Sequence, residues 1–216
     1  AGGFGDDQVP WITEGKWNSV EDYGLGTWWV AGSHVILKAF QTGDPRSIEP
    51  ALRASHDRVV SAGGSLFASA LRFEDPVVPT RREAPHLAFA AQIGLGILIG
   101  YDLRDMPAEP DGELQWLLHL KRDHPALQQT GSRRPVPTNA DDKYYAFVRT
   151  APDGGERILV VLNFQRGFQK IEVNLSGFDT GGLVELKTGE VLPPTSLLRT
   201  SLYSYGYRFY LLKPAP

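Results

Sequence analysis

The chain contains no cysteine, which excludes a disulfide framework and thiolate chemistry and leaves the cellular compartment open. It also has no lysine- or arginine-rich run, because its two Arg-Arg pairs, at 81–82 and 133–134, are isolated. The formal net charge of -3 is too small to indicate a nucleic acid or an anionic membrane as partner. The most apolar stretch, 87–103, is too short and too interrupted by glycine for a membrane span.

Metal-binding and nucleotide-binding patterns are also missing. None of the 5 histidines has the spacing of a metal site, and His119 and His124 do not share a helix face. No phosphate-binding loop, Gly-x-Ser-x-Gly or His-Glu-x-x-His motif occurs, and the glycines at 94–100 lead into a strand pattern instead of following one. We therefore expect no metal and no cofactor.

Residues 1–131 alternate between short apolar runs and helical patterns. Asp44 before Pro45 marks the start of a helix, and Gly63-Gly64 marks its end. Buried apolar strands that alternate with helices are typical of an α/β unit with a parallel sheet, whose chemistry lies at the carboxyl ends of the strands. The expected strands are 8–15, a short one near 25–30, 65–73 and 96–101, and the expected helices are 33–41, 44–62, 80–94 and 112–127.

Residues 132–216 instead have an all-β pattern. Turn-forming sequences at 152–155 and 166–167 separate strands expected at 144–149, 157–164, 168–175 and 207–212. The polar, Pro- and Gly-containing segment 129–139 marks the change of pattern. We expect two domains, 1–131 and 132–216, with the second an antiparallel β-sandwich onto which helix 112–127 docks.

Carboxylates close two of the apolar runs. Glu14 ends the first run, and Glu74 with Asp75 ends the third. Strands commonly end in polar loops, so a single carboxylate at a strand end would not indicate a catalytic residue. Two of them at the edge where parallel sheets place their chemistry make these positions candidate catalytic residues.

In these residues the chain resembles the C-terminal half of an α-amylase-family glycoside hydrolase, the retaining (β/α)8-barrel enzymes that act on α-glucans. The segment 11–15, Trp-Ile-Thr-Glu-Gly, resembles the fifth-strand motif of that family, and 71–75, Leu-Arg-Phe-Glu-Asp, stands in the place of its seventh-strand motif. Segments 86–101 and 117–131 resemble the end of the barrel and its connection to the C-terminal domain. The strand patterns after residue 140 resemble that domain.

The resemblance implies a partial (β/α) barrel, strands five to eight, followed by the β-sandwich. It makes Glu14 the general acid/base and Asp75 the residue that stabilises the transition state, with an α-glucan or oligosaccharide as substrate. Aromatic rings near these motifs are candidates for stacking on sugars, although packing with one wet edge is the common role of such rings. The candidate substrate-binding residues are Trp17, Tyr23, Trp28 and Tyr101.

The chain also departs from the family pattern. Phe73 and Glu74 stand where the family has Asn-His, and the fourth strand with its nucleophilic Asp would precede residue 1. An alternative alignment makes Asp7 the nucleophile, but Gly5 then replaces the essential Arg. Retaining glycosidases need two carboxyl groups about 5–5.5 Å apart. We therefore expect no activity from this chain alone, and another chain or an N-terminal segment to complete the barrel. The alternative is a non-catalytic carbohydrate-binding or structural subunit built on the same scaffold.

Overall fold

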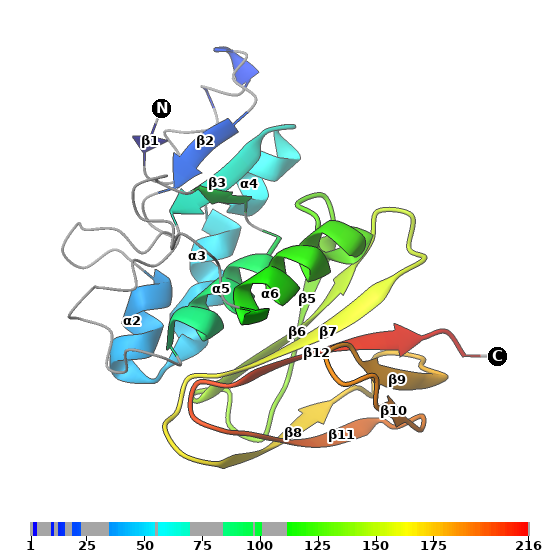
Figure 1. Ribbon diagram of the computed structural model, residues 1–216. Helices are drawn as coiled ribbons and strands as arrows, with labels where there is room; N and C mark the ends of the chain where they lie inside the picture. The colour runs from blue at the N-terminus through cyan, green and yellow to red at the C-terminus, as the bar shows by residue number, and fades with distance from the viewer. Residues whose placement is uncertain are drawn as a thin grey trace.

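The computed structural model describes residues 2–3, 10, 13–15, 19–22, 35–54, 56–69, 84–96, 98–100 and 112–215. The N-terminal part combines a parallel sheet with helices, and the C-terminal part is an antiparallel β structure (Figure 1). The predicted fold class, α/β followed by all-β, is confirmed.

The N-terminal sheet has four strands in the order β1-β2-β3-β4. They are β1 Gly2–Gly3, β2 Ser19–Asp22, β3 Ser65–Ser69 and β4 Leu98–Gly100. Every neighbouring pair is parallel. Sequential parallel strands require crossover connections, which explains the helical segments between them. Within the described residues, β1 and β4 are the two edges of this sheet.

The first predicted strand, 8–15, is wrong. Pro10 and Thr13 are helical, and the amides of Glu14 and Gly15 donate to the carbonyl of Pro10 at 2.8 and 3.1 Å. Proline is well suited to the first position of a helical turn because its φ is already fixed there and its missing N–H is not needed. The apolar run was therefore misassigned. A strand forms at Ser19–Asp22, where a loop was expected, and the predicted strand near 25–30 lies outside the described residues.

The helices agree more closely with prediction. The first is α2 Val35–Thr42, which ends at Gly43, where φ is +71°. The predicted helix 44–62 is divided into η2 Pro45–Ser47, α3 Ile48–Ala54 and α4 His56–Ser61. Asp44 caps η2 by accepting a hydrogen bond from the amide of Arg46 at 3.0 Å. The remaining helices are α5 Ala84–Gly94, α6 Gly112–Asp123 and η3 Pro125–Leu127.

The C-terminal part contains a six-stranded sheet, β10-β9-β12-β7-β6-β5, and a two-stranded sheet, β11-β8. All neighbouring strands are antiparallel, as predicted. The strands are β5 Ser132–Val136, β6 Tyr144–Thr150, β7 Arg157–Asn163, β8 Gln169–Asn174, β9 Gly182–Glu185, β10 Val191–Leu192, β11 Leu197–Leu202 and β12 Tyr207–Lys213.

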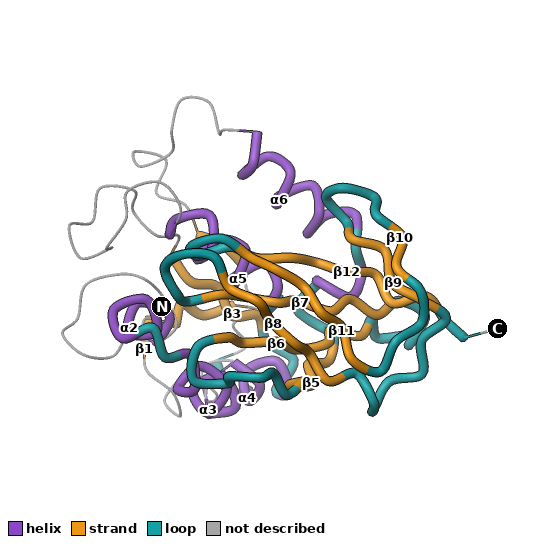
Figure 2. The backbone as a smooth tube through the Cα atoms, turned by 90° about the horizontal axis from the view of Figure 1, so that it is seen from below, coloured by secondary structure: helices purple, strands orange, loops and turns teal. Residues whose placement is uncertain are grey.

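Strands β6 and β7 are buried on both faces. Phe147 and Val160 belong to a core shared with the helices, whereas Val148 and Val161 belong to a second core that includes β8 and β11. This double burial explains why both strands are almost continuously apolar in sequence. Figure 2 shows α3 and α4 on the β5 side of the sheet and α6 on the β12 side. The division at residue 131 stays a prediction, since the first core crosses it.

Candidate functional site

In folds with a parallel sheet, the functional site lies at the carboxyl-terminal ends of the strands. There β1 ends at Gly3 beside Asp22 of β2, and β3 ends at Ser69 beside Gly100 of β4. The register therefore brings the ends of four chain segments that are distant in sequence to one edge.

Glu14 does not lie at the end of a strand. It is an exposed residue in the turn that follows the helical residues near Pro10, and only three residues separate Gly15 from the first residue of β2. Figure 1 shows this turn, drawn in blue, beyond the amino-terminal end of β2. The other predicted site residues, Asp75, Trp17, Tyr23, Trp28 and Tyr101, lie outside the described residues.

Two carboxylate positions at this edge were missed by the sequence argument. Glu21 and Asp22 are the last two residues of β2, with Glu21 paired to Phe67 and Asp22 to Gly3. The signal was the Glu-Asp pair after Val20, but the strand is short and glycine and aromatic residues follow it, which favoured a loop. Asp22 therefore lies at the carboxyl-terminal end of a parallel strand, the kind of position that was expected for Glu14.

A buried arginine joins the helical layer to the six-stranded sheet. Arg149 of β6 is 1% exposed and donates to the carbonyls of Ala126, Leu95 and Gln128 at 3.1, 3.2 and 2.6 Å. These carbonyls lie at the ends of α5 and η3, where helices leave acceptors unpaired. Burial, together with the positive charge of Arg133, lowers the pKa of Arg149 to about 10, so the guanidinium stays charged at neutral pH.

The space for this guanidinium comes from glycine. A Cβ at Gly96, where φ is +77°, would lie 2.5 Å from Nη2 of Arg149, and one at Gly131 would lie 3.0 Å from the same atom. Burial, and next the charge of Arg149, lower the pKa of the nearby Lys121 to about 8. The Lys121 ammonium donates to the carbonyl of Leu127 at 3.1 Å. The cluster is a rigid structural joint without a carboxylate partner for Arg149 in these contacts.

A second joint is ionic. Arg133 of β5, with its side chain 4% exposed, contacts Glu49 of α3 at 2.9 Å and Asp57 of α4 at 3.0 Å. The Tyr145 hydroxyl donates to Glu49 at 2.6 Å, and Arg53 donates to the same carboxylate at 2.9 Å. Burial opposes ionisation of Glu49, but the hydrogen bonds from Arg133, Tyr145 and Arg53 outweigh it. The pKa of Glu49 therefore lies below its usual value.

Replacing Glu49 by Gln should remove part of the acid sensitivity of folding. Because the pKa of Glu49 is lower in the folded chain, its stabilising effect is present above the unfolded value of 4.5 and is lost as pH falls through the folded value. The melting temperature of the native chain should exceed that of Glu49→Gln at pH 7. The gap should narrow between about pH 5 and pH 3. Thermal unfolding followed by circular dichroism measures it, and a constant gap would contradict the ionic role.

A third contact ties α6 to the sandwich. Glu113 accepts hydrogen bonds from the Tyr207 hydroxyl and from Lys187. The Lys187 ammonium also lies 5.6 Å from the ring centre of Trp116, which meets Phe209 edge-on at 6.1 Å. Burial opposes ionisation of Glu113, but the bonds from Lys187 and Tyr207 dominate and lower its pKa. The helix is therefore docked onto the sandwich, as predicted.

A cleft of about 260 Å³ lies where η2 and α3 meet β5 and β6. Its carboxylates are already engaged: Glu49 by the contacts above, and Asp141 by the amide and hydroxyl of Thr138, both at 2.7 Å. In the part of the chain that the structure describes, no group of three or more His, Asp or Glu side chains could hold a metal ion. No helix among the same residues is long and apolar enough to cross a membrane. The cleft is lined by Pro45, Arg46, Glu49, Pro135, Val136, Pro137, Asp141, Tyr144, Tyr145 and Ala146.

Comparison with known proteins gives the geometry a family context. Residues 136–209 match the family described as the maltogenic amylase C-terminal domain. This segment runs from the last residue of β5 into β12 and so covers most of the sandwich. No curated protein sequence matches the chain.

Solved structures extend the likeness to nearly the whole chain. An α-amylase from H. orenii matches with a TM-score of 0.69 at 13% identity, covering 96% of this chain and 51% of that one. The maltogenic α-amylase AmyB of Thermotoga neapolitana matches with 0.67 at 12% identity, covering 94% and 53%. AmyP, solved with maltose, matches with 0.67 at 15% identity, covering 92% and 50%.

The chain thus has the fold of a glycoside hydrolase segment in which a parallel α/β layer leads into an antiparallel β domain. The predicted resemblance to the C-terminal half of the α-amylase family is confirmed, and segment 136–209 matches the maltogenic amylase C-terminal domain. The chain spans about half the length of the solved α-amylases that it matches, 51% and 53% for the two named with organisms.

Proposed function

We propose that this chain is the C-terminal portion of a retaining α-glucan-acting hydrolase or transglycosylase and is inactive by itself. One observation carries the proposal: four parallel strands in sequential order lead into a β domain that matches the maltogenic amylase C-terminal domain. Among the described residues, β1 and β4 are open edges of that sheet. Four further strands from another chain or from an upstream segment would close it into a barrel.

The substrate class rests on the solved relatives. One α-amylase structure is described as complexed with acarbose, and AmyP was solved with maltose and, as a Glu-to-Gln variant, with maltotriose. These ligands were observed in those solved relatives. We infer an α-glucan or maltooligosaccharide for this chain because its fold matches theirs across both layers.

The catalytic roles proposed are acid/base for Glu14 and transition-state stabilisation for Asp75. A general acid must reach the scissile oxygen within hydrogen-bond distance, and its pKa must be raised by its surroundings. Glu14 is exposed and lies near the amino end of β2. This position favours the second proposal, a non-catalytic carbohydrate-binding or structural subunit.

Activity measurements on the isolated chain test the inactivity that both proposals expect of it. Residues 1–216 alone should release no reducing ends from maltooligosaccharides, because the nucleophile and the sugar-binding His of the family are missing from the aligned motifs. Turnover by the isolated chain that disappears in Glu14→Gln would contradict this expectation.

The longer protein tests the catalytic proposal directly. A protein that supplies the missing strands should hydrolyse or transfer α-glucosyl groups with retention, and Asp75→Asn should lower kcat by at least about 100-fold. Proton NMR of the first-formed anomer measures retention. Lys213→Ala, a change on an exposed position of β12, is the matched control. An inactive longer protein that still binds glucan would favour the non-catalytic subunit.

A further inference from the structure

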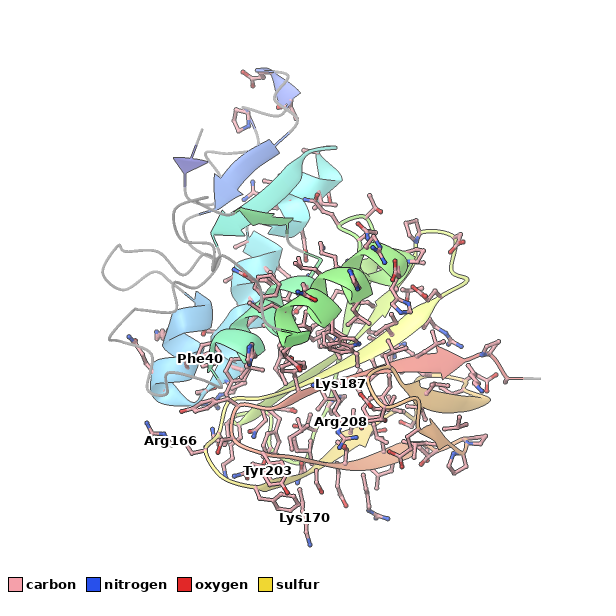
Figure 3. The ribbon with its side chains drawn as sticks, in the orientation of Figure 1. Phe40, Arg166, Lys170, Lys187, Tyr203 and Arg208 are labelled. Atoms are coloured by element: carbon pink, nitrogen blue, oxygen red, sulfur yellow. The ribbon has the colours of Figure 1, made fainter. Side chains whose placement is uncertain are left out.

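Two aromatic side chains project into solvent at one end of the sandwich. Phe168 is 53% exposed and Tyr203 is 76% exposed, and their rings meet edge-on with centres 5.5 Å apart. The other large apolar side chains that the described residues expose, Val191 and Leu197, are aliphatic. Figure 3 shows Tyr203 with Lys170 at the far end of the molecule from the parallel sheet.

The two turns that carry these rings are fastened to each other. They flank the first pair of the β8–β11 ladder, in which Gln169 is opposite Leu202. Asn163 is 0% exposed and donates to the carbonyl of Tyr203 at 2.8 Å, and the amide of Gly167 donates to the Ser204 hydroxyl at 2.6 Å. A buried polar side chain thus fixes the backbone of an exposed ring, so the pair is ordered before any ligand arrives.

The neighbouring residue, Tyr205, has φ of +51°, a left-handed backbone that is costly for a bulky side chain. Its own ring is 4% exposed and lies 5.9 Å from Phe40, while its hydroxyl accepts a hydrogen bond from Arg166 at 3.3 Å. The strained turn therefore anchors Tyr205 inward and directs Tyr203 outward. Strain of this kind persists where the surrounding structure holds it, and it clusters at ligand sites.

We propose that Phe168 and Tyr203 form an α-glucan-binding platform, a surface site outside the parallel sheet. Pyranose rings combine apolar C–H faces with hydroxyl edges, so they suit an aromatic face bordered by polar groups. Gln169 and Lys170 of β8 border this pair, with Lys170 exposed. The surface of two rings is far smaller than the roughly 1,200 Å² that a stable protein–protein interface buries, which disfavours a protein as the ligand. The choice of glucan rests on the proposed function.

Native electrophoresis of the 1–216 chain in gels containing amylopectin tests the platform without requiring catalysis. The native chain should be slowed, and the double variant Phe168→Ala with Tyr203→Ala should lose at least about tenfold in apparent affinity. Tyr203→Trp should keep binding, because it retains an aromatic face. Val191→Ala, which truncates an apolar side chain elsewhere on the surface with an exposure intermediate between those of the two rings, should migrate like the native chain.

Three outcomes would overturn the proposal: no retardation of the native chain, equal retardation of the double variant, or retardation that disappears in 300 mM salt. The last would indicate recognition of an anion by Lys170 and its neighbours, since a neutral glucan is insensitive to screening. Retardation together with an inactive longer protein would sink the catalytic proposal alone. Turnover by the longer protein without retardation would sink the platform alone.

Discussion

Replacing Arg149 by Met should destabilise the chain by about 3–5 kcal/mol. Methionine fills a similar volume but donates nothing, so the carbonyls of Leu95, Ala126 and Gln128 would lose the hydrogen bonds from the guanidinium, although Gln128 keeps the one from the amide of Gly131. An unsatisfied buried acceptor costs about 1–3 kcal/mol. Urea unfolding of the two proteins measures the difference. Arg149→Lys, which keeps the charge and one donor, should fall between them.

The matched control is Arg199→Met. The Arg199 side chain is 75% exposed and pairs with Glu172 at 2.9 Å on the surface of β8 and β11. Exposed ion pairs contribute about 0–1 kcal/mol. Equal losses for Arg149→Met and Arg199→Met would show that the buried guanidinium does not join the helical layer to the sheet. If Arg149→Met fails to fold while Arg149→Lys folds with reduced stability, the joint is supported.

Replacing Phe209 by Ala should cost about 3–5 kcal/mol. Phe209 of β12 is 0% exposed and packs edge-on against Trp116 of α6 and against Tyr207, both at 6.1 Å. Its removal opens a cavity between the helix and the sheet. Because the same core extends from α5 and α6 to β7, unfolding of the native chain should be one cooperative transition. Circular dichroism and tryptophan fluorescence during denaturation should therefore coincide.

Trp116→Ala should cost less than Phe209→Ala. A loss of about 3–5 kcal/mol applies to a fully buried tryptophan. Trp116 is only half-buried, and one face of its ring contacts the Lys187 ammonium. Val191→Ala, at a site 64% exposed, should stay within about 0.5 kcal/mol of the native value. Two separate transitions, or a Phe209→Ala effect no larger than that of Val191→Ala, would contradict a shared core.

Prediction from sequence succeeded where hydrophobic period and turn chemistry agreed. Helix α6 followed from apolar residues at helical spacing, and its buried residues are Leu114, Leu117 and Leu120. The antiparallel strands β6 and β7 followed from apolar runs separated by turn residues. It failed at 8–15, since a short apolar run containing Pro10 has the same composition in a strand and in a helical turn.

The sequence by itself determined the fold class, most elements of the sandwich and the family resemblance, because these depend on local periodicity repeated over many residues. Only the tertiary structure decided that Arg149 is a structural joint and that Phe168 and Tyr203 form an exposed aromatic pair. Arg149 appears in sequence as one more polar residue on a strand, and burial among three carbonyls gives it its role. Tyr203 and Tyr205 are two residues apart, yet packing and a left-handed turn bury one and expose the other. Such differences arise from contacts between distant segments, which no local pattern contains.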